Sequence, residues 1–213
     1  MNPYYQDEHV TLYHADCLQH LDMLDQADVL ITDPPYGSEV LSNGYGRTFK
    51  KIKNDSTTEY RDKVLELFEA KPALVFGSPR LPEPPGDWDH RLVWDKRQPG
   101  LGDGAWRYQH ESIFVRGKGW HKSSNRNFSI MQFSYENSHQ EKKAHVHAKP
   151  VRLMESLVNS APKGLIIDPF AGSGSTLRAA KNLGRKAIGF EIEEKYCEIT
   201  AQRLAQETLG IFQ

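Results

Sequence analysis

Two short motifs hold the residues of this 213-residue chain whose types and spacing suggest chemistry. The first is Asp33-Pro34-Pro35-Tyr36, and the second runs over residues 168–176 with the sequence DPFAGSGST. Each follows an apolar run typical of a buried strand, residues 29–32 in one case and 165–167 in the other. Both runs therefore lead into an aspartate at the carboxyl edge of a sheet, where open α/β folds bind ligands. Two such ends predict two adjoining pockets, one for each reactant.

The glycines of the second motif predict a tight turn next to a ligand. Gly172 and Gly174 let the backbone turn sharply and approach a ligand closely. Ser175 or Thr176 can then start a helix whose free amides face that ligand. Leu177 occupies the position of the third glycine of the dinucleotide-binding fingerprint. A dinucleotide-dependent oxidoreductase is therefore disfavoured.

Three acidic side chains are expected at strand ends. Asp168 suits a ligand with a positive amine, and Glu191 suits ribose hydroxyls. In the first motif the prolines restrict the backbone, so that the Asp33 carboxylate and the Pro34 carbonyl are held rigidly. Both accept hydrogen bonds, and a planar exocyclic amine offers two N–H donors. Tyr36 adds a flat face for stacking a base taken out of its helix. We interpret this motif as a grip on the amine of a nucleobase.

The elements that must hold these motifs alternate between strand and helix. Hydrophobic residues make up 38% of the chain and charged residues 26%, which is typical of a globular domain. The alternation predicts an α/β fold with a mostly parallel, buried sheet. Strands are expected at residues 10–13, 29–32, 73–76, 91–94, 112–115, 165–168 and 187–191, and helices at 17–24, 59–70, 151–160, 176–183 and 194–207.

Two long polar segments are predicted to be functional loops, residues 38–58 and 117–148. The net charge of −1 does not indicate nucleic-acid binding, but basic residues outnumber acidic ones in both segments. A local basic patch is what phosphate neutralisation requires. The residues expected to contact phosphates are Arg47, Lys50, Lys51, Lys122 and Arg126. Trp88, Trp94 and Trp106 are expected to pack in the protein, whereas Trp120 and Phe128 fit loop packing and DNA contact equally well.

Taken together, the ordered motifs resemble the β-class family of S-adenosylmethionine-dependent DNA amino-methyltransferases, which modify adenine N6 or cytosine N4. The resemblance covers nearly the whole chain, because the segments at residues 14–18, 94–96, 108–111, 147–151 and 190–196 fit it as well. It implies a Rossmann-like methyltransferase fold, with a twisted sheet and helices on both faces. It also implies one catalytic domain over residues 1–213, in which residues 117–148 form a short target-recognition segment.

The resemblance also implies roles for single residues. Asp168 would lie near the methionine amino group of the cofactor, Glu191 near its ribose and Asp16 near its adenine. The residues expected to grip the target base and support the chemistry are Asp33, Pro34, Pro35 and Tyr36. The residues expected to bind the cofactor are Asp16, Cys17, Asp33, Lys149, Asp168, Phe170, Ala171, Gly172, Ser173, Gly174, Ser175, Glu191 and Ile192.

The implied reaction is methyl transfer from S-adenosylmethionine to adenine N6 in flipped-out DNA, with cytosine N4 as the alternative. A more distant alternative is an inactive subunit that binds the cofactor and DNA. The ring-carbon route needs a cysteine nucleophile, and neither Cys17 nor Cys197 follows a proline as that route requires. No metal is expected, DNA is the expected partner, and a homodimer is left open. Residues 2–7 have no basic start or apolar stretch typical of a signal peptide, no run approaches membrane-spanning length, and Cys17 and Cys197 have no C-x-x-C spacing. We therefore expect a cytoplasmic protein without membrane association.

Overall fold

One mixed sheet forms the centre of the protein. The computed structural model describes residues 1–36, 57–97, 106–121, 128–134 and 148–206, and within them nine strands have the order β1-β2-β9-β8-β3-β4-β6-β5-β7. The strands are β1 (Tyr5–Gln6), β2 (Val10–His14), β3 (Val29–Thr32), β4 (Ala73–Gly77), β5 (His90–Asp95), β6 (His110–Arg116), β7 (Ile130–Gln132), β8 (Ile166–Asp168) and β9 (Ala187–Glu191).

The parallel part of the sheet brings the expected motif-bearing strands together. Strand β8 pairs in parallel with β3 on one side and with β9 on the other, while β2 and β4 extend this block outward. The carboxyl ends of β3, β8 and β9 therefore meet at one edge of the sheet. Strand β6 runs antiparallel to β4 and to β5, so that its beginning lies at this same edge.

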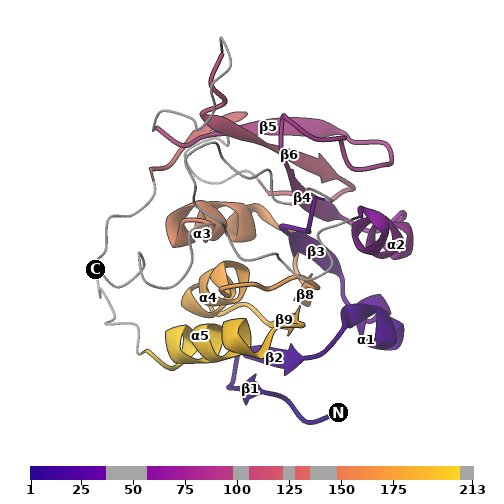
Figure 1. Ribbon diagram of the computed structural model, residues 1–213, viewed down its shortest axis with the longest axis vertical. Coiled ribbons are helices and arrows are strands. Elements are labelled where there is room, and N and C mark those ends of the chain that lie inside the picture. Colours follow the sequence, from indigo (N-terminus) through magenta and orange to yellow (C-terminus); the bar gives the residue numbers. More distant parts are fainter. Residues whose placement is uncertain (37–56, 98–105, 122–127, 135–147, 207–213) are drawn as a thin grey trace, which may run out of the picture.

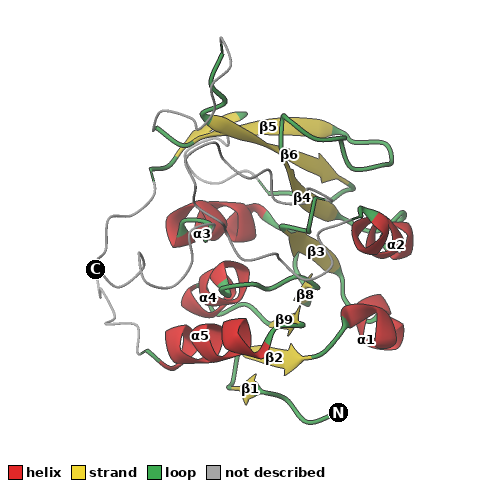
Figure 2. Cartoon of the chain, viewed as in Figure 1, coloured by secondary structure: helices red, strands yellow, loops and turns green. Residues whose placement is uncertain are grey.

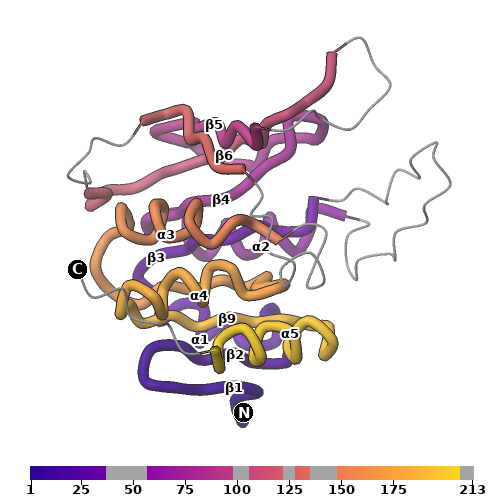
Figure 3. The backbone as a smooth tube through the Cα atoms, turned by 90° about the vertical axis from the view of Figure 1, so that its left-hand side faces the viewer, coloured from indigo at the N-terminus to yellow at the C-terminus, as the bar shows by residue number. Residues whose placement is uncertain are grey.

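Helices cover both faces of the sheet (Figure 1). One face carries the 3₁₀ helix η1 (Cys17–Gln19) with α1 (Leu21–Asp25) and α2 (Glu59–Leu67). The other carries α3 (Val151–Ser160), α4 (Ser175–Asn182) and α5 (Glu194–Ala205), which follow one another along the sheet (Figures 2 and 3). One buried apolar cluster lies between the sheet and each of these helix layers. The near-continuous apolar runs of β3 and β4 suit strands that are buried on both faces.

Most of the predicted elements are confirmed, including the α/β Rossmann-like architecture and all seven predicted strands. The helix expected at residues 17–24 is wrong in one respect, since it divides into η1 and α1 at His20, whose φ of −135° is not helical. The helix after the second motif begins at Ser175, one residue before the predicted start, and Gly184 follows its end with a left-handed φ of 63°.

The prediction of a loop over residues 117–148 is wrong at residues 130–132. These residues form β7, which pairs in parallel with β5. The strand is three residues long and has β5 as its partner, with Ser129 accepting a 2.7 Å hydrogen bond from the Val93 amide. So short an edge strand leaves no alternating pattern in the sequence. Most of the other predicted loop, residues 38–56, lies outside the described residues. No helix in the described part of the chain is long and apolar enough to cross a bilayer.

Candidate active site

Three acidic side chains lie at the carboxyl ends of three adjacent strands. Asp33 follows β3 directly, while Asp168 and Glu191 are the last residues of β8 and β9. The register pairs Asp168 with Gly189, two residues before Glu191. The expectation that the two motifs form adjoining pockets therefore agrees with the topology of the sheet.

Asp168 is a buried carboxylate held by hydrogen bonds. It is 2% exposed, and its Oδ1 accepts a 2.7 Å bond from the Thr32 hydroxyl and a 3.2 Å bond from the Phe170 amide. Burial raises the pKa of Asp168 to about 6, although these hydrogen bonds act to lower it. Among the residues that the structure describes, no cationic side chain forms an ion pair with it. Such a carboxylate fits a ligand that brings its own positive charge.

Glu191 is engaged with the backbone of the glycine turn. Its Oε2 accepts a 2.8 Å hydrogen bond from the Gly172 amide, and its Oε1 accepts a 2.8 Å bond from the Glu193 amide. Burial raises the pKa of its carboxyl group, against the effect of these amides. Each carboxylate oxygen still has a second lone pair, so Glu191 can hold the turn and also accept from a ligand hydroxyl.

The two glycines of the turn serve different purposes. Both have left-handed backbone angles, with φ of 50° at Gly172 and 75° at Gly174. A Cβ at Gly172 would meet no atom nearer than the Phe170 carbonyl oxygen at 3.9 Å, so the space beside this backbone is open. A Cβ at Gly174 would lie 2.4 Å from Thr200 Cγ2. Gly172 therefore fits close approach to a ligand, whereas Gly174 allows helix α5 to pack against the turn.

Other residues predicted to bind the cofactor are tied to the protein itself. Ser175 donates a 2.8 Å hydrogen bond to the Lys149 carbonyl, and the Ser173 carbonyl accepts a 3.0 Å bond from Arg203. Asp16 caps η1 by accepting a 3.0 Å bond from the Leu18 amide. Cys17 is buried, and burial raises the pKa of its thiol to about 12. Phe170, Ala171 and Ile192 lie beside the glycine turn or just after β9.

The first motif meets Lys149. The Asp33 carboxylate accepts hydrogen bonds from the Tyr36 hydroxyl at Oδ1 and from the Lys149 ammonium at Oδ2. The same ammonium lies 3.1 Å from the Glu111 carboxylate, and Lys96 lies 2.6 Å from the other oxygen of Glu111. Lys149 was predicted with the cofactor residues, and its side chain reaches the first motif instead of the glycine turn.

Glu111 and Lys96 lie in segments that fit the family resemblance, but neither was predicted to be a site residue. Glu111 reaches the site because β6 runs antiparallel to β4, so that the beginning of β6 lies at the edge where β3 and β8 end. The prediction that Trp106 packs inside the protein is wrong, since 88% of this residue is exposed. Trp94 is fully buried as expected, and Trp120 packs against the core.

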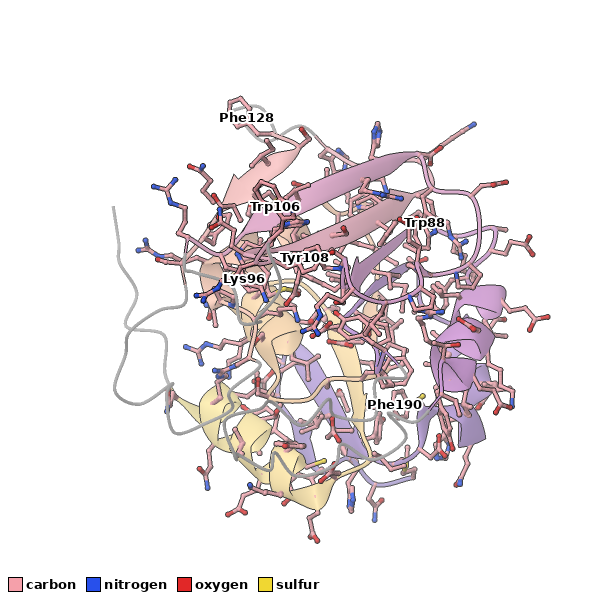
Figure 4. All side chains as sticks on the ribbon, turned by 45° about the horizontal axis from the view of Figure 1, so that its top comes forward. Trp88, Lys96, Trp106, Tyr108, Phe128 and Phe190 are labelled. Carbon is pink, nitrogen blue, oxygen red and sulfur yellow. The ribbon has the colours of Figure 1, made fainter. Side chains whose placement is uncertain are left out.

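The exposed aromatic residues are shown in Figure 4, where Trp106 and Tyr108 lie near Lys96. Phe128, left open between packing and contact with DNA, is 71% exposed. The predicted phosphate contacts Arg47, Lys50, Lys51, Lys122 and Arg126 all lie outside the described residues. Within the described part of the chain, no group of His, Cys, Asp or Glu residues could hold a metal ion.

A family model described as DNA methylase, N6_N4_Mtase, matches residues 88–202. The chain belongs to this family. It is 26% identical to the type II methyltransferase M2.LlaDCHI of Lactococcus lactis subsp. cremoris, over 95% of this chain and 91% of that protein. It is also 26% identical to M2.DpnII of Streptococcus pneumoniae, over 96% of this chain and 93% of that methyltransferase.

Solved structures share the fold of this DNA methylase. The complex of M1.HpyAVI with S-adenosylmethionine has a TM-score of 0.65 at 23% identity, covering 92% of this chain and all of that one. The cytosine-N4-specific PvuII methyltransferase has a TM-score of 0.69 at 16% identity, covering 98% of this chain and 90% of that one. The predicted family of S-adenosylmethionine-dependent DNA amino-methyltransferases is thus confirmed, and its cofactor is S-adenosylmethionine.

Proposed function

We propose that this DNA methylase transfers the methyl group of S-adenosylmethionine to the exocyclic N6 of adenine in DNA. The observation that carries the proposal is the connection between the two motifs. Asp33 follows β3, the adjacent strand β8 ends in Asp168, and Thr32 joins them through its 2.7 Å bond to Asp168. A base held at Asp33 and a cofactor held at Asp168 would therefore lie next to each other.

The buried acids and the open turn fit the cofactor. Asp168 has no cationic partner among the described side chains and would bind the ammonium of the methionine part. Glu191 would accept from the ribose hydroxyls, while Gly172 leaves room for the cofactor beside the backbone. S-Adenosylmethionine supplies an electrophilic methyl group on a sulfonium. The remaining residues predicted to bind it stay part of this proposal, with Asp33 and Lys149 contributing through their backbone.

The first motif would hold the target amine. The Asp33 carboxylate and the Pro34 carbonyl are acceptors for the two N–H groups of the amine, and Tyr36 would stack on the base. In a planar amine the lone pair of the nitrogen is delocalised into the ring, so these hydrogen bonds would favour a more pyramidal, more reactive nitrogen. The nitrogen would gain the methyl group as the bond between that carbon and the sulfonium sulfur breaks, which leaves a neutral thioether, and it would lose one proton, which Asp33 would accept. Positioning and electrostatic stabilisation would thus provide most of the rate enhancement.

Adenine is favoured over cytosine by the aspartate at position 33. In the family that the motifs resemble, Asp-Pro-Pro-Tyr more often accompanies adenine, whereas serine in place of Asp33 more often accompanies cytosine. The PvuII methyltransferase, whose fold is similar, is cytosine-N4-specific. Methylation of cytosine N4 is therefore the second candidate and the direct alternative outcome of the test below.

An aromatic and basic surface at the same edge of the sheet supports contact with DNA. Trp106 and Tyr108 precede β6 and are 88% and 46% exposed, and the exposed Arg107 lies between them. Exposed rings can stack on bases, and cations neutralise phosphates. The basic residues of segments 38–58 and 117–148 would add phosphate contacts. We further infer one domain over residues 1–213 and a short or relaxed recognition sequence, because few residues remain to read base edges.

The test is to methylate DNA with S-adenosylmethionine that carries a deuterated methyl group, digest the DNA to nucleosides and identify the labelled base by mass spectrometry. The proposal predicts labelled N6-methyladenine. Labelled N4-methylcytosine would replace it with the second candidate. DNA without label, at saturating cofactor and DNA, would contradict both and would favour an inactive subunit that binds the cofactor and DNA.

A further inference from the structure

A chain of alternating charges connects β5, β6 and the segment before α3 to the first motif. Lys96 lies 2.6 Å from Glu111, Glu111 lies 3.1 Å from Lys149, and Lys149 forms an ion pair with Asp33. Two cations and two carboxylates alternate, so the group as a whole is neutral. Its members come from positions 33, 96, 111 and 149, which are far apart in the sequence.

The centre of this chain is shielded from water. The side chain of Lys149 is 8% exposed and that of Glu111 is 13% exposed, whereas Asp33 at its outer end is 30% exposed. The Lys149 ammonium also lies 5.0 Å from the centre of the Phe76 ring and 5.9 Å from that of Trp94. Charges in such surroundings have a strong mutual attraction, and removal of one partner leaves a costly unpaired charge. Lys149 is therefore held in one place.

Glu111 is held in its ionised form by its two lysine neighbours. Both neighbouring lysines lower the pKa of its carboxyl group, although burial acts in the opposite direction. Lys149 is also held through its backbone, because its carbonyl oxygen accepts the 2.8 Å hydrogen bond from Ser175 at the start of α4. The backbone of Lys149 is thus fixed to the second motif and its ammonium to the first.

We propose that Lys149 and Glu111 are positioning residues for methyl transfer. Glu111 fixes the Lys149 ammonium, and this ammonium fixes the Asp33 carboxylate beside the glycine turn. The proposal rests on the proposed function, and it gives Lys149 a second role apart from cofactor binding. Lys149 joins the residue that would grip the target amine to the helix that follows the glycine turn. A small displacement of Asp33 would then slow the reaction without weakening the binding of the cofactor.

The experiment measures two quantities for each variant, the affinity for S-adenosylmethionine by calorimetry and the single-turnover rate of methyl transfer on saturating DNA. Glu111→Gln keeps the shape of the side chain and removes its charge. Lys149→Met removes the ammonium and keeps an unbranched side chain of similar length. For both variants we expect a rate lower by about 10²-fold, the scale of a misplaced catalytic group, with cofactor affinity within about twofold of the wild type.

Two further variants serve as controls, Lys149→Arg for the charge of Lys149 and Asp7→Asn for the loss of an ion pair elsewhere. Lys149→Arg retains the positive charge, so it should recover at least about tenfold of the rate lost in Lys149→Met. Asp7 forms a 2.6 Å ion pair with Lys181, and these side chains are 22% and 21% exposed. Because that pair involves the loop before β2 and helix α4, away from Asp33, Asp7→Asn should retain the wild-type rate. It thereby controls for the general effect of removing an ion pair.

Three results would overturn the proposal. A normal rate in Glu111→Gln, with an active wild type, would show that Glu111 does not position Lys149 for the reaction. A loss of cofactor affinity in Lys149→Met, with a normal rate at saturation, would show that Lys149 serves the cofactor pocket alone. Equal losses in Lys149→Arg and Lys149→Met would show that the charge of Lys149 is not what positions Asp33. A wild-type protein that transfers no methyl group to DNA would instead contradict the proposed function itself, and this proposal with it.

Discussion

The hydroxyl of Thr32 donates a 2.7 Å hydrogen bond to the carboxylate of Asp168. Thr32 is the last residue of β3 and directly precedes the first motif, while Asp168 begins the second. The two motifs are thus joined by a buried contact between neighbouring strands. Because the bond favours the ionised carboxylate, it also works against the effect of burial on Asp168.

We predict that Thr32→Val weakens cofactor binding at neutral pH. Asp168 must be ionised to bind the ammonium of the cofactor, and its pKa is already raised to about 6. In the wild type, affinity should therefore fall as the pH falls below about 6, by about tenfold per unit. Loss of the Thr32 hydroxyl raises the pKa of Asp168 further, so this fall should begin at a higher pH. Calorimetric titrations from pH 5.5 to 8 would measure it.

Thr32→Ser is the matched control for that experiment, because serine retains the hydroxyl. Its affinity should have the same pH dependence as that of the wild type. Coincident pH profiles for Thr32→Val and Thr32→Ser would mean that the hydrogen bond does not affect the ionisation of Asp168.

Asp168→Asn should stabilise the free protein at alkaline pH. Since the pKa of Asp168 is about 6 in the folded protein and the ordinary pKa of an aspartate is 3.8, the contribution of Asp168 to stability is fully present below pH 3.8 and is lost as the pH rises through 6. At pH 8 the loss is about 3 kcal/mol. Asparagine carries no charge, so urea denaturation should find the variant more stable than the wild type at pH 8 and the difference smaller at pH 4.5.

The exposed Asp25 supplies the control for stability. It pairs with Lys71 at 2.9 Å, and its side chain is 71% exposed. Asp25→Asn should therefore give no gain at pH 8. If Asp168→Asn proved less stable than the wild type at pH 8, burial would not be the dominant influence on Asp168.

The sequence predicts the fold and the motif pair well, for a physical reason. Continuous apolar runs before Asp33 and Asp168 identify buried parallel strands, and such strands bring their ends to one edge. Glu111 and Lys96 could not be found in this way, because they reach the site through the antiparallel pairing of β5 and β6, which no local pattern encodes. The exposure of Trp106 was missed since its residue type favours packing. The pairing of β5 with β6 and the exposure of Trp106 both depend on the folded chain, so the local sequence does not reveal them.

Tyr36 is predicted to act through its ring more than through its hydroxyl. In the free protein this hydroxyl donates to Asp33, the same carboxylate that would accept from the target amine. Tyr36→Phe keeps the ring and removes the hydrogen bond from the hydroxyl to Asp33. We therefore expect a single-turnover rate of methyl transfer within about tenfold of the wild type. Tyr36→Ala also loses stacking, a contribution of about 1–3 kcal/mol per base, and should lose most of the transfer. Equal losses in both variants would assign the hydroxyl an essential role.

Trp106→Ala should weaken DNA binding. The indole is 88% exposed at the edge of the sheet that carries Asp33, and a stacking contact of this kind contributes about 1–3 kcal/mol. We therefore expect a Kd for DNA about tenfold higher, with unchanged affinity for the cofactor. Tyr4→Ala is the control, because Tyr4 is 39% exposed next to β2 at the opposite end of the sheet. Fluorescence anisotropy with labelled DNA would measure both, and equal effects would exclude a specific role for Trp106.

In the proposed function, Asp33 grips the target amine while Asp168 and Glu191 hold the cofactor. The most direct test is the single-turnover rate of Asp33→Ala on saturating DNA, with cofactor affinity measured on the same preparation. We expect a cofactor affinity within about twofold of the wild type and a rate lower by at least about 10²-fold. A near-normal rate in Asp33→Ala, at saturating cofactor and DNA, would contradict it.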